Sequence, residues 1–239
     1  MLRISVLYPK PKGAPGAGPP YPLAVFTGGF LVPSQSYFTY AQHLASYGYT
    51  ALLYDKLESA FEPLDDLISV SMIGELLDWA RLDPVLSRIA DSSRTFLCGH
   101  SRGGKLSVLA AVGDPRVKAV FLADPVDSTV WAPEGPDFPS AIAALQRLPS
   151  RTVPLAVVGG GVGSDCAPKS ANYRRFYEFT GGPAWEVLVR NAGHFQFLDN
   201  QSALQRAICA VGPVDDSRVR AVAQAVMVAW GEALRQQSS

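Results

Sequence analysis

The segment Gly99-His100-Ser101-Arg102-Gly103 places a serine between two glycines in the pattern Gly-x-Ser-x-Gly. An apolar run precedes it, and a segment with helical apolar spacing follows from Arg102 to Val112. This context is typical of a nucleophile elbow, a sharp strand-to-helix turn that holds a strained serine with its hydroxyl exposed. The N–H groups at the start of the helix favour negative charge beside that serine. We therefore expect Ser101 to be a nucleophile; the alternative is a tight turn whose serine merely caps the helix.

A serine hydroxyl needs a base, usually a histidine that a carboxylate orients. The chain has three histidines, His43, His100 and His194. His43 precedes the serine on an expected helix, where a surface or packing role is favoured. His100 adjoins Ser101, and neighbouring residues of an extended segment point in different directions. His194 follows a predicted strand, and such sheets place their chemistry at the carboxyl ends of strands. The predicted base is His194.

Two aspartates are candidates for the acid that orients His194. Asp124 directly follows one predicted strand, and Asp165 lies in the glycine-rich loop after the next one. An aspartate before proline also fits a plain turn, and Asp165 also fits a cap on the segment after it. From the residues alone Asp165 is slightly favoured, because the later strand is the commoner source of the acid.

A tetrahedral oxyanion needs two backbone donors. The N–H of Arg102, directly after the serine, is one predicted donor. The other is the N–H of Phe30, because Gly28-Gly29-Phe30 follows a short apolar strand and allows a close backbone approach. A phosphate-binding turn at these glycines is the weaker interpretation, since neither G-x-G-x-x-G nor the P-loop lysine pattern is present.

Alternating strand and helix patterns must position these residues. They predict an α/β-hydrolase fold, with a mostly parallel central sheet, helices on both faces, and one domain over residues 1–239 that carries a cap-like insertion at about 128–150. Strands are predicted at residues 1–8, 23–27, 50–54, 94–98, 118–123, 153–158 and 185–189. Helices are predicted at residues 36–47, 67–81, 102–112, 141–148, 171–179 and 217–235, with a Pro- and Gly-rich loop at 9–22.

The composition of the 239 residues, 48% hydrophobic and 18% charged, indicates a globular protein with a full core. Basic and acidic residues number 21 each, so nucleic acid is not an expected partner. The apolar runs are far shorter than the ~20 residues of a membrane span, and the first residues do not resemble a signal peptide. A cytoplasmic location is expected. The scattered Cys98, Cys166 and Cys209 predict free thiols, and the pattern predicts no metal site.

The segment Gly99-His100-Ser101-Arg102-Gly103-Gly104-Lys105 resembles the lipase motif of chlorophyllases, in which the arginine and the lysine are characteristic. The similarity extends over roughly residues 23 to 200 and includes Gly29–Leu31 followed by Tyr37–Tyr49, Asp124-Pro125-Val126, Cys166-Ala167-Pro168 with Asn172, and Gly193-His194 with Leu198-Asp199. In one departure, Thr27-Gly28-Gly29 stands where the family usually has His-Gly, which concerns the substrate more than the chemistry.

This resemblance implies hydrolysis of the phytyl ester of chlorophyll to chlorophyllide and phytol, through an acyl-enzyme on Ser101 and without a cofactor. It also implies that the acid is the aspartate of Asp-Pro-Val, so the prediction moves to Asp124 and keeps Asp165 as the alternative. The enzyme would be at most peripheral to pigment membranes. Two other hypotheses stay open: a broad-specificity carboxylesterase or lipase-like enzyme, and a non-catalytic binding protein.

The expected partner is a small hydrophobic ester, and several apolar residues are predicted to line its cleft. These residues are Leu31, Val32, Val130, Trp131, Phe138 and Phe195, with Phe197 as a further candidate. For each of them the alternative is ordinary packing in the core or in a turn. Arg102 is also expected to anchor the elbow helix through hydrogen bonds.

Overall fold

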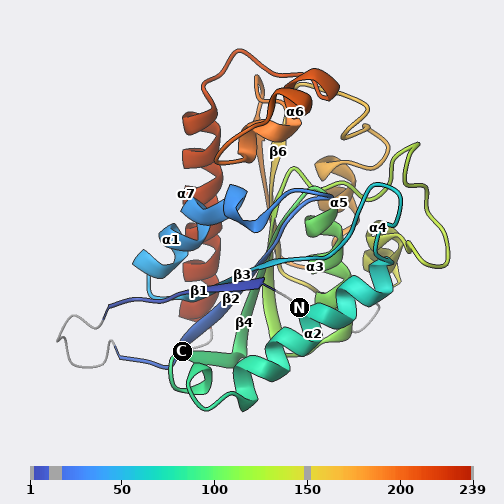
Figure 1. The fold of residues 1–239 in the computed structure, drawn as a ribbon. Helices are drawn as coiled ribbons and strands as arrows, with labels where there is room; N and C mark the ends of the chain where they lie inside the picture. The colour runs from blue at the N-terminus through green and yellow to red at the C-terminus, as the bar shows by residue number, and fades with distance from the viewer. Residues whose placement is uncertain (1–2, 11–17, 148–151, 238–239) are drawn as a thin grey trace.

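The computed structural model describes residues 3–10, 18–147 and 152–237, and in these residues seven strands form one sheet (Figure 1). The strands lie in the order β1-β3-β2-β4-β5-β6-β7. All neighbours are parallel except β1 and β3, which are antiparallel. Their bounds are β1 (Arg3–Leu7), β2 (Tyr21–Thr27), β3 (Thr50–Asp55), β4 (Ala90–His100), β5 (Val117–Ala123), β6 (Leu155–Gly160) and β7 (Ala184–Val189).

Helices cover both faces of the sheet, with α1 and α7 on one side and α2 to α5 on the other (Figure 1). The α-helices are α1 (Phe38–Ser46), α2 (Asp66–Leu82), α3 (Arg102–Gly113), α4 (Ala141–Gln146), α5 (Tyr173–Phe179), α6 (Ala203–Ile208) and α7 (Asp216–Gln237). Short 3-10 helices are η1 (Ser34–Tyr37), η2 (Leu86–Arg88) and η3 (His194–Phe197). The predicted mostly parallel sheet between two helical layers is confirmed.

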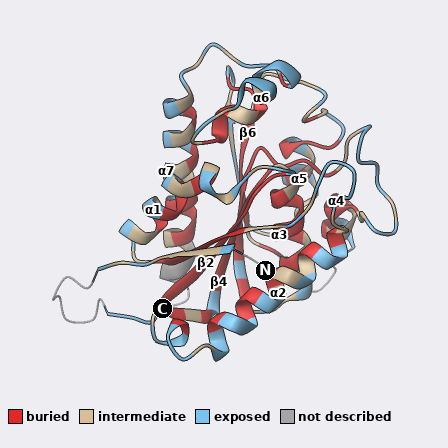
Figure 2. Cartoon of the chain, in the orientation of Figure 1, coloured by how far each residue is buried: buried red, intermediate tan, exposed pale blue. Residues whose placement is uncertain are grey.

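Strand β2 is buried along its whole length and is mostly apolar, because helices cover both faces of the sheet (Figure 2). In β2, Leu23 and Val25 belong to the cluster under α2 to α5, whereas Ala24 and Phe26 belong to the cluster under α1 and α7. Successive side chains of a strand point to opposite faces. The sheet therefore supplies two cores, and its carboxyl edge is where the loops of the site emerge.

Several element boundaries differ from the prediction. Strand β4 begins at Ala90, four residues before the predicted start, because Ala90 and Asp91 pair with Tyr21 and Pro22 ahead of a bulge. The predicted helix at 36–47 is split into η1 and α1, while η2 and α6 were not predicted. Residues 1–2 of the first predicted strand, 11–17 of the loop and 148–151 of the insertion lie outside the described residues. One domain with an insertion at 128–150 stays a prediction.

The prediction of free thiols is wrong for two of the three cysteines. Cys166, in the loop after β6, forms a disulfide with Cys209, which follows α6, 43 residues further along the chain. Only the fold brings these distant segments together, so the spacing of the cysteines gave no sign of the pair. Cys98 is a free and buried cysteine of β4, as predicted.

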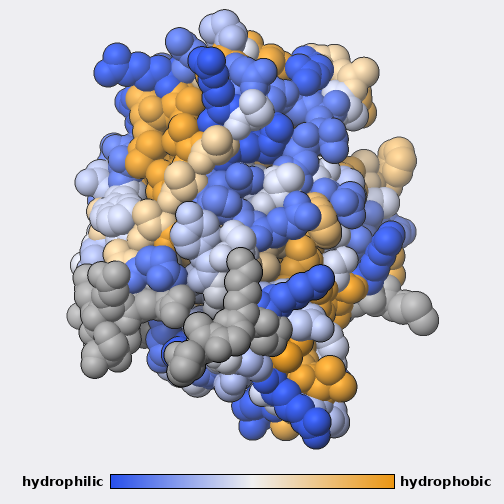
Figure 3. All heavy atoms as spheres, turned by 90° about the vertical axis from the view of Figure 1, so that its left-hand side faces the viewer, coloured by the Kyte–Doolittle hydropathy of each residue, from blue (hydrophilic) through white to orange (hydrophobic). Residues whose placement is uncertain are grey.

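Within the described ranges, no helix is both long enough and apolar enough to cross a bilayer. On the face of the molecule that carries α1 and α7, exposed apolar side chains gather in separate areas among polar ones (Figure 3).

The turn from β4 into α3 brings three backbone segments into close contact. A Cβ atom on Gly103 would lie 2.1 Å from the carbonyl oxygen of Thr27 in β2, and one on Gly99 would lie 2.3 Å from the carbonyl oxygen of Gly103. Real side chains do not tolerate such distances, so both positions require glycine. This close approach presses the start of α3 onto the ends of β2 and β4.

Replacing Gly103 with alanine is expected to reduce the free energy of unfolding by at least ~1–3 kcal/mol, because the new methyl group meets rigid backbone. Gly113→Ala in the same helix is the matched control, since no described atom outside the helix would lie within 4 Å of its Cβ. The control is expected to be neutral or stabilising by up to ~1 kcal/mol. Urea unfolding of both variants measures the difference, and equal losses would contradict the packing argument.

Candidate active site

Ser101 stands between β4 and α3 with a backbone φ of 55° and ψ of −129°. Among the described residues, Leu31, Ser101 and Asp124 are the non-glycine residues with positive φ. A strained backbone of this kind persists where the surrounding structure enforces it, and it clusters at functional sites. The strained conformation predicted for the serine is present.

Ser101, His194 and Asp124 form a continuous hydrogen-bonded chain. The Ser101 Oγ lies 2.9 Å from His194 Nε2, and His194 Nδ1 lies 2.6 Å from Asp124 Oδ2. An ionised carboxylate only accepts hydrogen bonds, so Nδ1 carries the proton and Nε2 accepts one from the serine hydroxyl. The other oxygen of Asp124 accepts the N–H of Gly160 at 2.8 Å. This geometry would allow His194 to take the proton of the Ser101 hydroxyl.

Burial separates the two candidate acids. Asp124 is 2% exposed and His194 3% exposed, so their hydrogen bond is shielded from water. Asp165 is exposed on the loop after β6. The structure pairs the histidine with Asp124, the aspartate that the family resemblance favoured, and not with Asp165, which the residues alone had favoured. The catalytic roles of these side chains stay predictions.

The Gly29–Phe30 backbone lies directly against the serine. A Cβ on Gly29 would be 3.1 Å from the Cβ of Ser101. Within the part of the chain that the structure describes, the N–H groups of Phe30 and Arg102 donate to no protein acceptor. Two unused amides beside a serine oxygen suit the stabilisation of an oxyanion.

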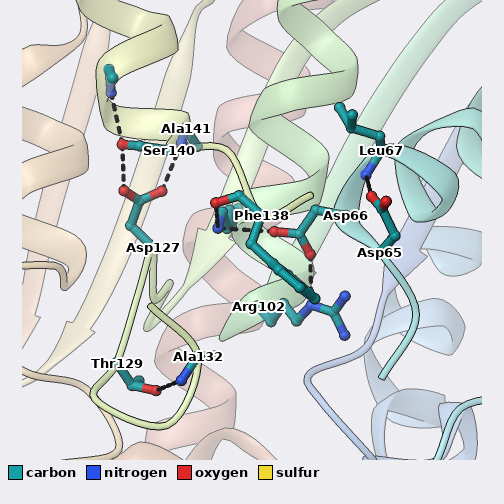
Figure 4. A network of polar contacts seen from close by, with 12 residues as sticks. Asp65, Asp66, Leu67, Arg102, Asp127, Thr129, Ala132, Phe138, Ser140 and Ala141 are labelled. Carbon is teal, nitrogen blue, oxygen red and sulfur yellow. Dashed lines mark hydrogen bonds and ion pairs between the residues drawn. The ribbon is translucent and has the colours of Figure 1, made fainter. Parts of the chain in front are cut away.

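The side chain of Arg102 is held by carboxylates from two other segments. Figure 4 shows one of them, Asp66. Its Nε donates to Asp66 Oδ1 and its Nη1 donates to Glu58 Oε2, both at 2.7 Å, and its Nη2 donates to the carbonyl of Leu64. Asp66 begins α2, and Glu58 lies in the loop after β3. Arg102 thus ties the start of α3 to both, in agreement with its expected anchoring role.

Lys105, one turn further along α3, pairs with the second oxygen of Asp66 at 2.9 Å, and Lys56 lies 3.3 Å from Glu58. All five of these charged side chains are at most 12% exposed. Sequence reasoning missed the two acids. The sequence did contain a sign of them, because Arg102 and Lys105 form a cationic pair at i and i+3 on an otherwise apolar helix. Such a pair needs buried anionic partners.

The guanidinium of Arg102 also lies between two aromatic rings. Its central carbon is 5.7 Å from the ring centre of Phe30 and 5.6 Å from that of Phe138, distances typical of cation–π contacts. Two residues of the predicted site, Phe30 and Phe138, therefore both contact Arg102.

Asp127 holds the insertion nearby, since its carboxylate accepts hydrogen bonds from the Ser140 hydroxyl at 2.6 Å and the Ala141 amide at 2.7 Å (Figure 4). Burial raises the pKa of Asp127.

The other predicted cleft residues divide into two groups. Leu31 and Val32 line a pocket of about 270 Å³ beside residues 28–30, the loop with the predicted oxyanion donor, called the oxyanion loop below. The Phe195 ring lies 5.1 Å from that of His194. Val130 and Trp131 are 83% and 69% exposed, on a turn that protrudes from the insertion.

The further candidate Phe197 does not belong to a cleft. Its side chain is fully buried in the core under α1 and α7, which corrects that prediction: flanking the histidine in sequence did not place it in the site. Among the described residues, no group of three or more His, Cys, Asp or Glu side chains is arranged to hold a metal ion.

The chlorophyllase family model matches residues 4–239. The chain belongs to the chlorophyllase family. It is 28% identical to chlorophyllase-2 of Arabidopsis thaliana, in an alignment covering 76% of this chain and 62% of the relative. It is 27% identical to chlorophyllase-1 of the same plant, over 89% of this chain and 73% of the relative. The chain thus spans less than two thirds of the length of chlorophyllase-2.

Solved structures resemble the fold. A ferulic acid esterase from Streptomyces cinnamoneus superposes with a TM-score of 0.66 at 22% identity, covering 92% of this chain and 69% of the esterase. A putative dienelactone hydrolase from Klebsiella pneumoniae superposes with a TM-score of 0.64 at 15% identity, covering 97% and 99%. At these identities the likeness shows the α/β-hydrolase fold alone.

Replacing Asp66 with asparagine is expected to destabilise the protein by ~3–5 kcal/mol, because Arg102 and Lys105 lose their shared buried carboxylate. The matched control is Glu178→Gln, which breaks an exposed pair with Arg175, whose N···O distance is 2.6 Å. The control is expected to cost at most ~1 kcal/mol. Urea unfolding compares them, and a loss in Asp66→Asn no larger than that of the control would refute the anchoring role.

Proposed function

We propose that this chain is a serine carboxylic-ester hydrolase of chlorophyllase type, which cleaves the phytyl ester of chlorophyll to chlorophyllide and phytol. The observation that carries the proposal is the hydrogen-bonded chain from Ser101 through His194 to Asp124. Membership of the chlorophyllase family supports the choice of ester.

In the first half of the reaction, Ser101 Oγ bonds to the ester carbonyl carbon while His194 Nε2 takes the hydroxyl proton. The N–H groups of Phe30 and Arg102 stabilise the oxyanion, and Asp124 stabilises the imidazolium. The carbon–oxygen bond to phytol then breaks, and His194 gives its proton to the leaving alkoxide. An acyl-enzyme on Ser101 remains.

In the second half, His194 takes a proton from water as the water oxygen bonds to the acyl carbon. The second tetrahedral intermediate collapses, the bond to Ser101 Oγ breaks, and His194 returns the proton to the serine. The products are the carboxylic acid and the regenerated enzyme. Every step uses groups of this chain, the ester and water.

A large apolar ester is favoured by the side chains at the edge of the sheet where Ser101 lies. The loops after β2, β3 and β5 all emerge at that edge, because these strands are parallel to β4. These loops expose large apolar residues, namely Phe30, Leu31, Leu57, Phe61, Val130 and Trp131. Exposed apolar groups on loops at one edge of a sheet favour an apolar partner.

The second candidate function is a carboxylesterase for small esters. The observation in its favour is the size of the pocket beside the oxyanion loop, since about 270 Å³ is below the ~300–1,000 Å³ typical of drug-sized ligands. Lys56 and Glu58 add polar groups to its lining. Such a pocket suits a short acyl group.

The substrate assay combines detergent-solubilised chlorophyll a with the purified protein, followed by chromatography for chlorophyllide. Chlorophyllide is expected from the wild type and not from Ser101→Ala. Ser101-dependent cleavage of a p-nitrophenyl ester without any chlorophyllide would replace the first candidate function with the second. Turnover that persists in Ser101→Ala would contradict both.

The acid assignment is tested with two matched variants. Asp124→Asn is expected to lower kcat on the order of 10⁴-fold, because His194 loses the partner that fixes its tautomer. Asp165→Asn, the control, is expected to leave kcat close to that of the wild type, because that side chain is exposed and the hydrogen bond of His194 goes to Asp124. Steady-state kinetics on one soluble ester compares them, and the reverse ranking would overturn Asp124 as the acid.

A further inference from the structure

Tyr37 and His100 form a second hydrogen-bonded chain, behind the one that contains Ser101. The Tyr37 hydroxyl accepts the N–H of Gly29 at 3.0 Å and lies 2.9 Å from His100 Nδ1. His100 Nε2 lies 3.0 Å from the backbone carbonyl oxygen of His194. The chain therefore runs from the loop that carries Phe30 to the backbone of the histidine proposed as base.

The direction of every hydrogen bond in this chain is determined. A carbonyl oxygen only accepts hydrogen bonds, so Nε2 of His100 carries a proton and donates a hydrogen bond to the carbonyl oxygen of His194. In a neutral imidazole the other nitrogen then accepts, so the Tyr37 hydroxyl donates to Nδ1. That hydroxyl oxygen in turn accepts from Gly29. Each donor faces one acceptor, and none is left over.

The surroundings keep His100 neutral. It is fully buried, and its ring lies 4.8 Å from that of His194, 6.2 Å from that of Phe197 and 5.7 Å from that of Tyr37. Burial, together with the nearby His194, lowers the pKa of His100 well below its ordinary value. A neutral ring also adds no repulsion when His194 becomes an imidazolium.

We propose that Tyr37 and His100 are positioning residues that lock the oxyanion loop and the His194 loop to each other across Ser101. Because Tyr37 occupies the N–H of Gly29, the next amide, that of Phe30, is the one left for an oxyanion. Because His100 holds the carbonyl of His194, the backbone that aims the imidazole is fixed to the same network. This inference rests on the proposed function.

The end of this network at Gly29 lies close to the serine. A Cβ on Gly29 would lie 3.1 Å from Ser101 Cβ and 3.3 Å from His100 Nδ1. Displacement of reacting groups by about 1 Å can cost ~10²-fold in rate, so a rigid link of this kind matters for turnover. Sequence reasoning assigned no role to His100 because it considered only whether its side chain could reach the serine.

The kinetic test uses Tyr37→Phe, His100→Gln and the double variant on a soluble p-nitrophenyl ester. Each single change is expected to lower kcat by ~10–100-fold, as for other residues that orient reacting groups, with KM nearly unchanged. The double variant is expected to be no slower than the slower single variant, because either change breaks the same link. If His100→Gln does not fold, Tyr37→Phe alone provides the test.

The matched control is Tyr173→Phe, which removes the hydroxyl of another buried tyrosine, an acceptor of the Arg174 Nε–H at 3.1 Å on α5. Its kcat is expected to stay close to that of the wild type. A decrease in kcat for Tyr173→Phe as large as that for Tyr37→Phe would overturn the proposal, because general loosening of the core would explain both. Single effects that multiply in the double variant would also overturn it. So would a change in KM with no change in kcat.

Amide hydrogen exchange tests the link without turnover. Tyr37→Phe is expected to speed exchange in the peptide that contains His194, and His100→Gln in the peptide that contains Gly29, whereas Tyr173→Phe changes neither. Unchanged exchange at the distant end would overturn the link. If the wild type hydrolyses no ester but exchange is coupled in this way, the link stands and the proposed function alone fails.

Discussion

The site depends on the close contact between the first turn of α3 and the ends of β2 and β4. Glycine at positions 99 and 103 lets these backbones touch, and the resulting sharp turn places Ser101 at positive φ. Its hydroxyl then projects at the carboxyl edge of the sheet, where the loops after β2, β5 and β7 bring Phe30, Asp124 and His194.

Charge stabilises this contact from one side and hydrogen bonds from the other. Arg102 and Lys105 fasten the start of α3 to Asp66 and to the loop after β3, inside a region from which water is largely excluded. Removing one partner of such a cluster is costly because a buried charge is left uncompensated. Opposite it, Tyr37 and His100 connect the loops on either side of the serine. The motif residues around Ser101 therefore shape its surroundings as well as supplying the proposed nucleophile.

The features of the fold and of the site that depend on local sequence patterns could be predicted from the sequence. The sheet, its helical layers, Ser101 and His194 follow from periodicity, a short motif and chain order. Asp124 does not, because two strand ends carry an aspartate. The family resemblance favoured Asp124, and the three-dimensional structure shows that it is the one bonded to His194. The buried acids that hold Arg102, and the disulfide between Cys166 and Cys209, join segments far apart in the chain. The cationic pair on α3 indicates that buried acids must exist, but no local pattern shows which acids they are or that the two cysteines meet.

The central claim is that Ser101 is a nucleophile activated by His194 and Asp124. The most direct measurement treats the protein with a fluorophosphonate, which reacts covalently with activated serines, and locates the adduct by mass spectrometry of peptides. The account predicts one adduct, on Ser101, that forms far more slowly in Asp124→Asn. An adduct on another residue, or none on the folded wild-type protein, would contradict it.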